Sequence, residues 1–519
     1  MVKARVAGFA ALLFWVCGLP VFAQDVTLTS RDGRVEISGN LLGFDGEFYR
    51  VDTIYGELTV DGSGVDCAGP GCPNLETFIA QAVFSGAPTI GRMLLPALLE
   101  AFAIRSEHDL SFQELEDGTV LAILADPVEE RVVGEVFLRL NNSDTGIAEL
   151  IQGDADIAMS MREIRDEELR AAQEEGLGDL EARGRSRVVA LDALVPMVSP
   201  SNPVQVMTLP DLAGVLSGET MNWSDLGGPD APISVHVHGP NTGLGQAIDD
   251  LVLKPAGKNL TSDAKIFNDG RSLSEAVTKD PFALGLTSQT EVGNNWALAL
   301  GGGCGFALQA TRRAVKTEDY PLTAPVFLYV PARRFPKLVR EFLAFLRDPS
   351  AQLVIRRAGF VDQGEEEISV NEQGDRFANA ITLAGPEVSL DELQRLVASL
   401  SPLRRLTTSF RFEPGSARLD AQSRSNVLRL ARALEQGRYD TRRLLFVGFS
   451  DGEGAAATNK RIAMRRAEAV RDAVRTAAET ANLTRVTMDV DAFGEALPMA
   501  CDETAWGRRI NRRVEVWIR

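Results

Sequence analysis

The chain has 519 residues, a net charge of −18 at pH 7 and a hydrophobic fraction of 45%, which fit a globular protein of two to four domains. The charge is uneven, because residues 401–519 hold 22 basic and 15 acidic side chains and the excess of carboxylates lies before them. The acidic front part excludes nucleic acid as its partner, and the change of sign indicates a domain boundary.

The first residues have the pattern of a secretory signal peptide. Two basic residues precede an apolar run from Val6 to Val21, and Ala23 is a small residue before a cleavage site. Because the run is too short for a membrane span, we predict residues 1–23 as a signal peptide and a mature protein in the periplasm. The alternative is a lipoprotein acylated at Cys17, but the residues before that cysteine suit acylation poorly.

Residues 24–72 are predicted to form a small β domain of about four strands. Apolar and polar residues alternate there, and turn pairs such as Asp45-Gly46 recur at short spacing, which is typical of hairpins. Cys67 and Cys72 bracket a turn-rich loop, and in an oxidising compartment they favour a disulfide over zinc. Cys304 and Cys501 fall in different predicted domains, and their pairing stays open.

Residues 73–364 alternate strand-like and helical patterns, which indicates an α/β architecture. Apolar residues recur at helical spacing in residues 94–102 and 335–346. Apolar runs at 188–198 and 327–330 are typical of buried strands. The polar segment that follows, residues 365–402, is predicted as a linker or exposed excursion.

Residues 403–519 are predicted to run strand, helix, strand, helix, strand, strand. The predicted elements after the first strand are a helix over 420–436, a strand over 444–449, a helix over 459–480 and strands over 486–493 and 514–518.

A motif in this last region carries a resemblance. The run Gly448-Phe449-Ser450-Asp451-Gly452-Glu453-Gly454 is followed by Asn459 and Arg466-Ala467, and the chain closes with Gly507-Arg508-Arg509-Ile510-Asn511-Arg512-Arg513-Val514-Glu515. These separated motifs resemble the OmpA-like peptidoglycan-binding family. The departures are Phe449 for a histidine, Ala463 for a serine and the lack of a tyrosine before Asn459.

The resemblance implies non-covalent attachment to peptidoglycan through diaminopimelate in its stem peptides. The side-chain end of diaminopimelate is a zwitterion, so its recognition needs an anion and a cation side by side. Asp451 can accept the ammonium, Arg466 can hold the carboxylate in a bidentate fork, and Asn459 lies two helical turns before Arg466 on the same face. The alternative is an internal Asp451–Arg466 salt bridge. Two interpretations stay open for Arg508, Arg512 and Arg513: they form a solvated basic surface, or they contact the polymer.

The middle region resembles the phosphate-type periplasmic solute-binding proteins. The segments that carry this resemblance are Ser85–Ile90, Gly146–Arg162, Ala190–Val198, Leu216–Gly228 and Tyr320–Leu322. The resemblance implies a two-lobed, type II periplasmic-binding-protein fold with ligand in the cleft between its lobes. The whole chain is thus expected to be an α/β and α+β multidomain protein.

The family holds a tetrahedral oxyanion with hydroxyls, amides at helix N-termini and one arginine. Candidate anion-binding residues here are Thr89, Ser143, Ser160, His238, Thr242 and Gly243. His238 stands where the family has its arginine, Met161 replaces a polar residue, and Asp144 adds a charge unfavourable to an anion. Two interpretations stay open: the cleft binds phosphate or a related oxyanion, aided by protonated His238, or it has lost that ligand.

The sequence contains none of the common catalytic motifs in a fitting context, so we expect a protein that is not an enzyme and needs no cofactor or metal. We ascribe the pair His236 and His238 to packing of the strand or the cleft rather than to a metal site. The first hypothesis is a solute-binding domain held on peptidoglycan, in the periplasm and in possible association with the outer membrane. The alternative is a structural envelope protein whose lobes dock a protein partner.

Overall fold

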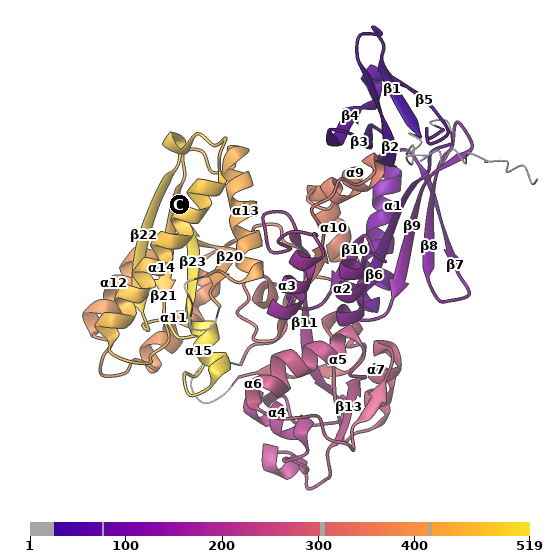
Figure 1. Cartoon of the computed structure of the whole chain (residues 1–519). Coiled ribbons are helices and arrows are strands. Elements are labelled where there is room, and N and C mark those ends of the chain that lie inside the picture. Colours follow the sequence, from indigo (N-terminus) through magenta and orange to yellow (C-terminus); the bar gives the residue numbers. More distant parts are fainter. Residues whose placement is uncertain (1–24, 75–76, 302–306, 414–415, 417) are drawn as a thin grey trace, which may run out of the picture. The chain divides into compact units, whose positions relative to one another are not determined.

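The computed structural model describes residues 25–74, 77–301, 307–413, 416 and 418–519. The chain divides into two compact units, the first formed by residues up to Ala80 together with Arg334–Lys337 and the second by the remainder (Figure 1). The predicted signal peptide and Cys304 lie outside the described residues. Within the described ranges, no helix has both the length and the apolar character needed to cross a membrane.

The first unit is built on an antiparallel sheet of five strands in the order β4-β3-β2-β1-β5, one more than the approximate number predicted. Its strands are β1 (Val26–Ser30), β2 (Glu36–Phe44), β3 (Phe48–Thr53), β4 (Gly56–Asp61) and β5 (Val65–Ala68). At the turn after β2, the Asp45 carboxylate accepts the backbone N–H groups of Glu47 and Phe48, and Gly46 supplies a φ of +90°. The predicted disulfide between Cys67 and Cys72 is confirmed.

The second unit contains a sheet of eleven strands, ordered β14-β13-β15-β11-β18-β10-β6-β9-β8-β7, with β16 paired to β11. The bounds are β6 (Ala80–Gly86), β7 (Asp109–Glu114), β8 (Val120–Asp126), β9 (Arg131–Leu140), β10 (Ile157–Ser160), β11 (Ser186–Val198), β13 (Ser234–His238), β14 (Lys265–Phe267), β15 (Ala283–Ser288), β16 (Trp296–Ala297) and β18 (Thr323–Tyr329). A separate pair joins β12 (Val206–Met207) to β17 (Ala299–Leu300).

The long strand β11 joins the two halves of this sheet. Its residues 186–193 pair with β18, whereas its residues 194–198 pair with β15. This is the crossing strand expected of two α/β lobes. The main helices of the lobes are α1 (Leu95–Arg105), α2 (Ser143–Gln152), α3 (Asp166–Glu174), α4 (Leu209–Ser217), α5 (Gly243–Ile248), α7 (Gly270–Lys279), α9 (Lys337–Phe345) and α10 (Pro349–Arg357).

The C-terminal region forms a second sheet of five strands, ordered β19-β20-β23-β21-β22. Its elements are β19 (Glu367–Ile368), β20 (Arg404–Arg411), α13 (Ala421–Glu435), β21 (Arg443–Phe449), α14 (Ala456–Ala477), β22 (Thr487–Gly494), α15 (Ala505–Asn511) and β23 (Arg513–Ile518). The predicted order of strands and long helices is confirmed, and the short helix α15 is added between the last two strands.

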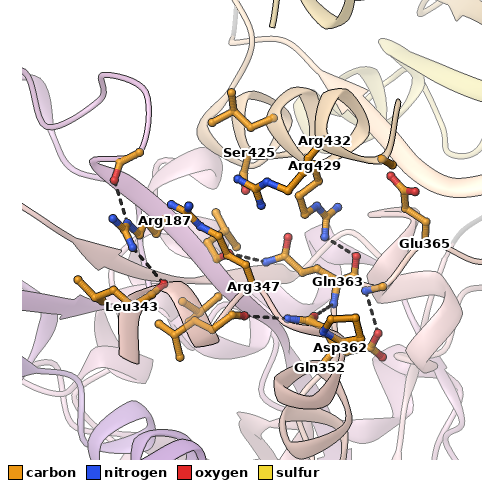
Figure 2. A pocket seen from close by; sticks show the side chains of 18 of the residues that line it. Arg187, Leu343, Arg347, Gln352, Asp362, Gln363, Glu365, Ser425, Arg429 and Arg432 are labelled. Atoms are coloured by element: carbon orange, nitrogen blue, oxygen red, sulfur yellow. Dashed lines mark hydrogen bonds between the residues drawn. The ribbon is translucent and has the colours of Figure 1, made fainter. Parts of the chain in front are cut away.

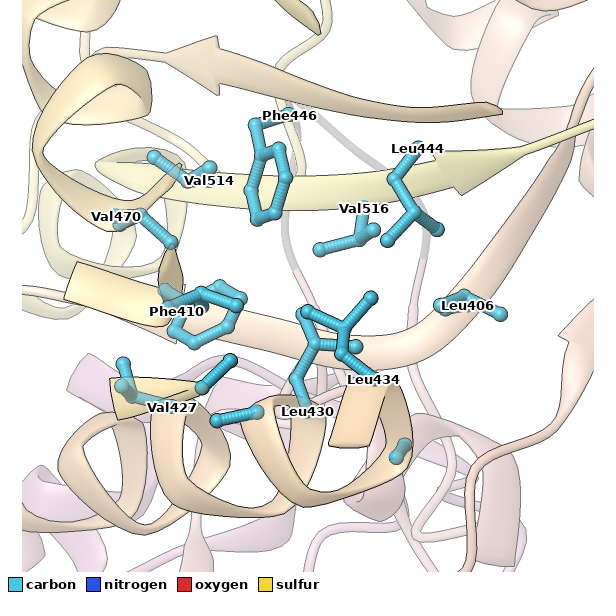
Figure 3. Packing of buried hydrophobic residues seen from close by; sticks show 14 of the residues in the cluster. Leu406, Phe410, Val427, Leu430, Leu434, Leu444, Phe446, Val470, Val514 and Val516 are labelled. Atoms are coloured by element: carbon cyan, nitrogen blue, oxygen red, sulfur yellow. The ribbon is translucent and has the colours of Figure 1, made fainter. Parts of the chain in front are cut away.

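Helices α13 and α14 contribute to the core on one face of this sheet, where buried aliphatic and aromatic side chains meet (Figure 3). Leu430 and Leu434 of α13 pack there with Phe410, Phe446 and Val516 from three strands. The helical spacing of the apolar residues in α13 therefore corresponds to its buried face.

Replacing Leu430 by alanine should remove part of this core. Because the side chain is fully buried and a well-packed core relaxes only partly around a cavity, the free energy of unfolding should fall by about 2–5 kcal/mol. Chemical denaturation of the mature protein, followed through the C-terminal transition, measures the change. Leu390→Ala, at an exposed leucine, is the matched control, and an equal effect of both changes would contradict this packing.

The other face of the same sheet is covered by the segment predicted as a linker. Residues 365–402 contain β19, the short helical turn Val370–Gln373, α11 (Gly374–Thr382) and α12 (Leu390–Leu400). Leu393, Leu396 and Leu400 of α12 pack with Val447 and Trp517 of the sheet. The segment is therefore folded onto the C-terminal sheet rather than extended.

Candidate functional site

The residues of the C-terminal motif lie at the end of β21 and on α14. Asp451 lies two residues after the end of β21, and Asn459 and Arg466 belong to the helix. A Cβ atom at Gly448 would lie 2.0 Å from the carbonyl oxygen of Ala463, so glycine is required for strand and helix to approach this closely. The motif thus fixes the loop that carries Asp451 against the helix that carries Arg466.

Asp451 is buried and its carboxylate pairs with Arg512, at 2.6 Å from Nη1. Arg466 is half-buried, and its guanidinium lies 5.1 Å from the ring centre of Phe412. Burial and the neighbouring Arg512 lower the pKa of Arg466, whereas Asp451 acts in the opposite direction. Among the described residues, no carboxylate lies within ion-pair distance of Arg466, so the alternative of an internal Asp451–Arg466 salt bridge is not found in this part of the chain.

Asn459 is buried and supports the surroundings of the motif. Its Nδ2 donates a hydrogen bond to Glu495 at 2.9 Å. On the other side of the loop, the N–H of Gly452 donates to Asp502, which also accepts a hydrogen bond from Asn511. Both contacts join the motif to the closing segment of the domain and hold the loop in place.

The closing arginines differ from one another. Arg513 is fully buried, where it pairs with Glu515 at 2.7 Å and lies over the ring of Phe449 at 4.4 Å. The solvated-surface interpretation is therefore wrong for Arg513. Arg512 contacts Asp451 directly, which the sequence spacing did not indicate. The contact arises only because β23 pairs with β21 and places Arg513 opposite Phe449.

In the two-lobed region, Ser143 and Gly243 come together at the N-termini of α2 and α5. A Cβ atom at Gly243 would lie 3.5 Å from the Ser143 hydroxyl, 3.0 Å from the methyl group of Ala87 and 3.5 Å from the side chain of Met161. All four residues are buried. Apolar groups of Ala87 and Met161 thus pack against the backbone where the resemblance places an anion.

The candidate hydroxyl groups are held by local hydrogen bonds. Ser143 accepts the N–H of Met161, and Ser160 donates to the carbonyl of Arg162 at 2.7 Å. Thr242 caps α5 by accepting the N–H of Gly245 while it donates to the carbonyl of Gly239. Thr89 is half-buried and makes no capping hydrogen bond with its side chain. An anion would have to displace some of these bonds.

His238 is buried, and its Nε2 lies 3.0 Å from the hydroxyl of Thr287. Burial lowers the pKa of His238 to about 4, so the imidazole is neutral at pH 6 as well as at pH 7. A phosphate site that uses a protonated His238 would therefore need a much more acidic medium. His236 stacks on Phe267, and among the described residues no group of three metal-ligating side chains occurs.

The charge of Asp144 is compensated by two arginines. Arg162, which is buried, donates to Asp144 and forms a two-bond contact with Glu168, and Arg165 lies 3.1 Å from Asp144. Arg165 also lies 3.3 Å from Asp250 in the helical segment Asp249–Leu253 that follows α5, so it links the two lobes. A cavity of about 310 Å³ opens beside this contact and is lined by Asp144, Arg165 and His238, among others. The sequence reasoning missed Arg165, because only the fold brings it to the cleft.

Comparison with known families agrees with both resemblances. Residues 118–349 match the family model of the PBP superfamily domain, and residues 411–512 match that of the OmpA family. The chain therefore combines these two domain types.

Individual relatives match about half of the chain. Protein SphX of Synechococcus elongatus is 28% identical over 256 residues, which span 45% of this chain and 74% of that protein. The phosphate-binding protein PstS of Borreliella burgdorferi is 24% identical over 249 residues, 44% of this chain and 85% of that protein. The solved structure of an ABC-type phosphate transport receptor from Vibrio cholerae aligns with 21% identity and a TM-score of 0.42, covering 54% of this chain and 99% of that one.

Proposed function

We propose that this chain, which joins a PBP superfamily domain to an OmpA family domain, is an envelope protein that is held on peptidoglycan and displays a two-lobed solute-binding domain in the periplasm. The observation that carries the proposal is the cation Arg466, which lies beside the Asp451 loop and has no ion-pair partner among the described side chains. A carboxylate of diaminopimelate would supply that partner, and Asp451 would accept its ammonium group.

Cosedimentation of the mature protein with purified sacculi tests the tether. Retention should fall when diaminopimelate is added in excess, because the free amino acid carries the same zwitterion. Cadaverine, which carries an ammonium group at each end of a five-carbon chain but no carboxylate, should compete much less. Equal competition by diaminopimelate and cadaverine would contradict recognition of the zwitterion.

For the lobes, we propose phosphate or a related oxyanion as the ligand. Support comes from the resemblance to phosphate-binding relatives and from Ser143, Thr242 and Gly243 at two helix N-termini. Arg165, which lines the cavity of about 310 Å³ together with His238, is the cation that could stand in for the family's arginine. Opening of its contacts with Asp144 and Asp250 would make its guanidinium accessible to the ligand.

A second function is favoured by the packing of Ala87 and Met161 against Gly243. In this alternative, the lobes no longer bind an oxyanion and serve as a structural body that docks a protein of the envelope. A cleft filled by apolar side chains would not close around a ligand, so the two functions differ in a measurable way.

Calorimetric titration of the mature protein with inorganic phosphate distinguishes these two functions. If the cleft binds phosphate with a neutral His238, its affinity at pH 6 and at pH 7.5 should differ only through the second ionisation of phosphate itself, and His238→Gln should leave that pH dependence unchanged. Sulfate, which has no ionisation in this range, is the matched control. No heat with either anion supports the structural alternative, and a histidine-dependent gain at pH 6 would contradict the burial of His238.

A further inference from the structure

A second cavity lies away from both sites described above. It has a volume of about 510 Å³, a size typical of cavities that take small organic ligands. Its walls come from the start of β11, the junction of α9 and α10, the segment Asp362–Glu365 and helix α13 (Figure 2). Hydrogen bonds join these walls, because Gln363 donates to the carbonyl of Val188 and Arg429 donates to the carbonyl of Gln363.

The cavity has a large excess of positive charge. Six arginines and two carboxylates line it, a formal balance of +4. Both carboxylates have their own partners: Asp362 pairs with Lys316 at 2.9 Å and with Arg356 at 3.0 Å, and Glu365 accepts a hydrogen bond from Tyr439. The acidic groups of the cavity therefore do not neutralise its remaining arginines.

Three of these arginines face one another without a counter-ion. Arg187 comes from β11, Arg347 from the turn before α10, and Arg432 from α13 (Figure 2). In the described part of the chain, no carboxylate lies within ion-pair distance of any of the three. Burial, followed by repulsion from nearby arginines that include Arg347 and Arg432, lowers the pKa of Arg187 to about 10. The three cations thus repel one another.

Their orientation is fixed in part. Arg187 donates through Nε to the carbonyl of Gly184 and through Nη1 to the carbonyl of Leu343, so its remaining donors can serve a ligand. Next to them, Arg429 uses both terminal nitrogens on Gln363 and Asn426, while its buried Nε makes no hydrogen bond. A buried donor without an acceptor is costly, and an anion or its hydration in the cavity would relieve that cost.

The remaining wall is apolar. Val188, Val189, Leu346, Leu353 and Leu428 line it, so the occupant needs a carbon skeleton beside its charged group. Three guanidinium groups from three different elements suit a phosphate group, since each can hold separate oxygens of a dianion in a planar fork. An inorganic ion would satisfy the arginines but would leave the apolar wall in contact with water.

We propose that this cavity is a binding site for a small phosphate monoester, held by Arg187, Arg347 and Arg432, and that it is distinct from the cleft between the lobes. The site joins β11, which runs through both lobes, to helix α13 of the OmpA family domain. Its occupant therefore contacts both domain types and neutralises the repulsion among the three arginines.

The test is calorimetric titration of the mature full chain with phenyl phosphate, whose ring suits the apolar wall, with phenol as the uncharged control. Binding is expected for the phosphate ester alone, and it should weaken as salt concentration rises. Arg347→Gln combined with Arg432→Gln should weaken binding by about tenfold or more, because charge-assisted hydrogen bonds are lost. Arg357→Gln, which removes an exposed cation of α10 outside the cavity, should leave the affinity unchanged.

Thermal unfolding provides a second readout. The double variant should be at least as stable as the wild type without ligand, because it removes like charges that repel, and it should lose the stabilisation that phenyl phosphate gives to the wild type. Inorganic phosphate can bind at these arginines as well as in the cleft, so the phosphate binding that remains in the double variant reports on the cleft between the lobes. Absence of binding by the ester, or equal affinity of the wild type and the double variant, would overturn the proposal.

Discussion

Replacing Arg466 by glutamine is expected to reduce retention of the mature protein on purified sacculi by about 10- to 100-fold, the range that corresponds to one or two charge-assisted hydrogen bonds. Arg466 has no ion-pair partner among the described residues, and its guanidinium lies against Phe412. Its loss should therefore remove a ligand contact without breaking an internal pair. The fraction that cosediments with sacculi, measured over a range of sacculus concentrations, gives the change in affinity.

The lysine variant separates charge from geometry. Arg466→Lys keeps the positive charge but cannot form two parallel hydrogen bonds with a carboxylate, so its retention should fall between those of the wild type and the glutamine variant. Arg465→Gln is the matched control, because it removes an exposed cation from the neighbouring position of α14. Retention of Arg466→Gln at the level of this control would refute the proposed contact.

Asp451→Asn should have a comparable effect on retention, with a different structural consequence. The Asp451 carboxylate pairs with Arg512 at 2.6 Å, so its removal leaves a second cation beside Arg466. The variant should lose its attraction for the ligand's ammonium and become sensitive to salt. Circular dichroism would show whether the loop change is local, as the hydrogen bonds of Asn459 and Gly452 predict.

The elements that carry the proposed peptidoglycan contact could be predicted because their residues lie close together in the sequence. Asp451, Asn459 and Arg466 fall within one strand–loop–helix unit, and helical spacing alone places the last two on one face. Arg512 could not be assigned in the same way. Its contact with Asp451 depends on the antiparallel pairing of β23 with β21, which no local pattern encodes.

The segment before the C-terminal domain contains a helical pattern of apolar residues that its polar composition conceals. Acidic and polar residues dominate its first part, which favours a linker. Leu393, Leu396 and Leu400 nevertheless follow one another at spacings of three and four, the period of an amphipathic helix, and they cover the second face of the sheet. The apolar periodicity predicted this structure better than the composition did, because one apolar face is enough to hold a helix against a sheet.

The cleft was harder to assess from sequence, because charges there are balanced by residues distant in the chain. Asp144 suggests a site that repels anions, yet Arg162 and Arg165 pair with its carboxylate. Conversely, His238 suggests a titratable cation, yet burial keeps it neutral. Residue identity gave the chemistry of each group, but its charge state and accessibility depend on tertiary packing.

Replacing Glu515 by glutamine is expected to lower the free energy of unfolding of the C-terminal region by about 3–5 kcal/mol, the cost of removing one partner from a buried ionic cluster. Glu515 is fully buried. It pairs with Arg376 of α11, with Arg513 at 2.7 Å and with Arg405 at 3.4 Å, and Arg405 in turn contacts Asp319 of the two-lobed region at 2.7 Å.

The variant would leave these arginines close together with less negative charge to compensate them. Calorimetric scanning of the full mature chain should therefore show the C-terminal transition shifted downward by about 10 °C. Asp489→Asn is the matched control, because its carboxylate pairs with Arg443 at an exposed position, where a pair contributes about 0–1 kcal/mol. Similar shifts for both variants would contradict the role assigned to the buried cluster.

The dependence of this effect on pH gives a sharper test. Burial alone would raise the pKa of Glu515, but the attraction of Arg376, Arg405 and Arg513 outweighs burial and holds it well below its usual value. A carboxyl group with a depressed pKa in the folded state stabilises the fold above the pKa of the unfolded chain, and that contribution disappears as the pH falls. The difference in stability between wild type and Glu515→Gln should therefore stay constant from pH 7 to about 5 and shrink below about pH 4.5. A difference that grows on acidification would mean that Glu515 is protonated in the folded protein, and the cluster would then be held by neutral hydrogen bonds instead of ion pairs.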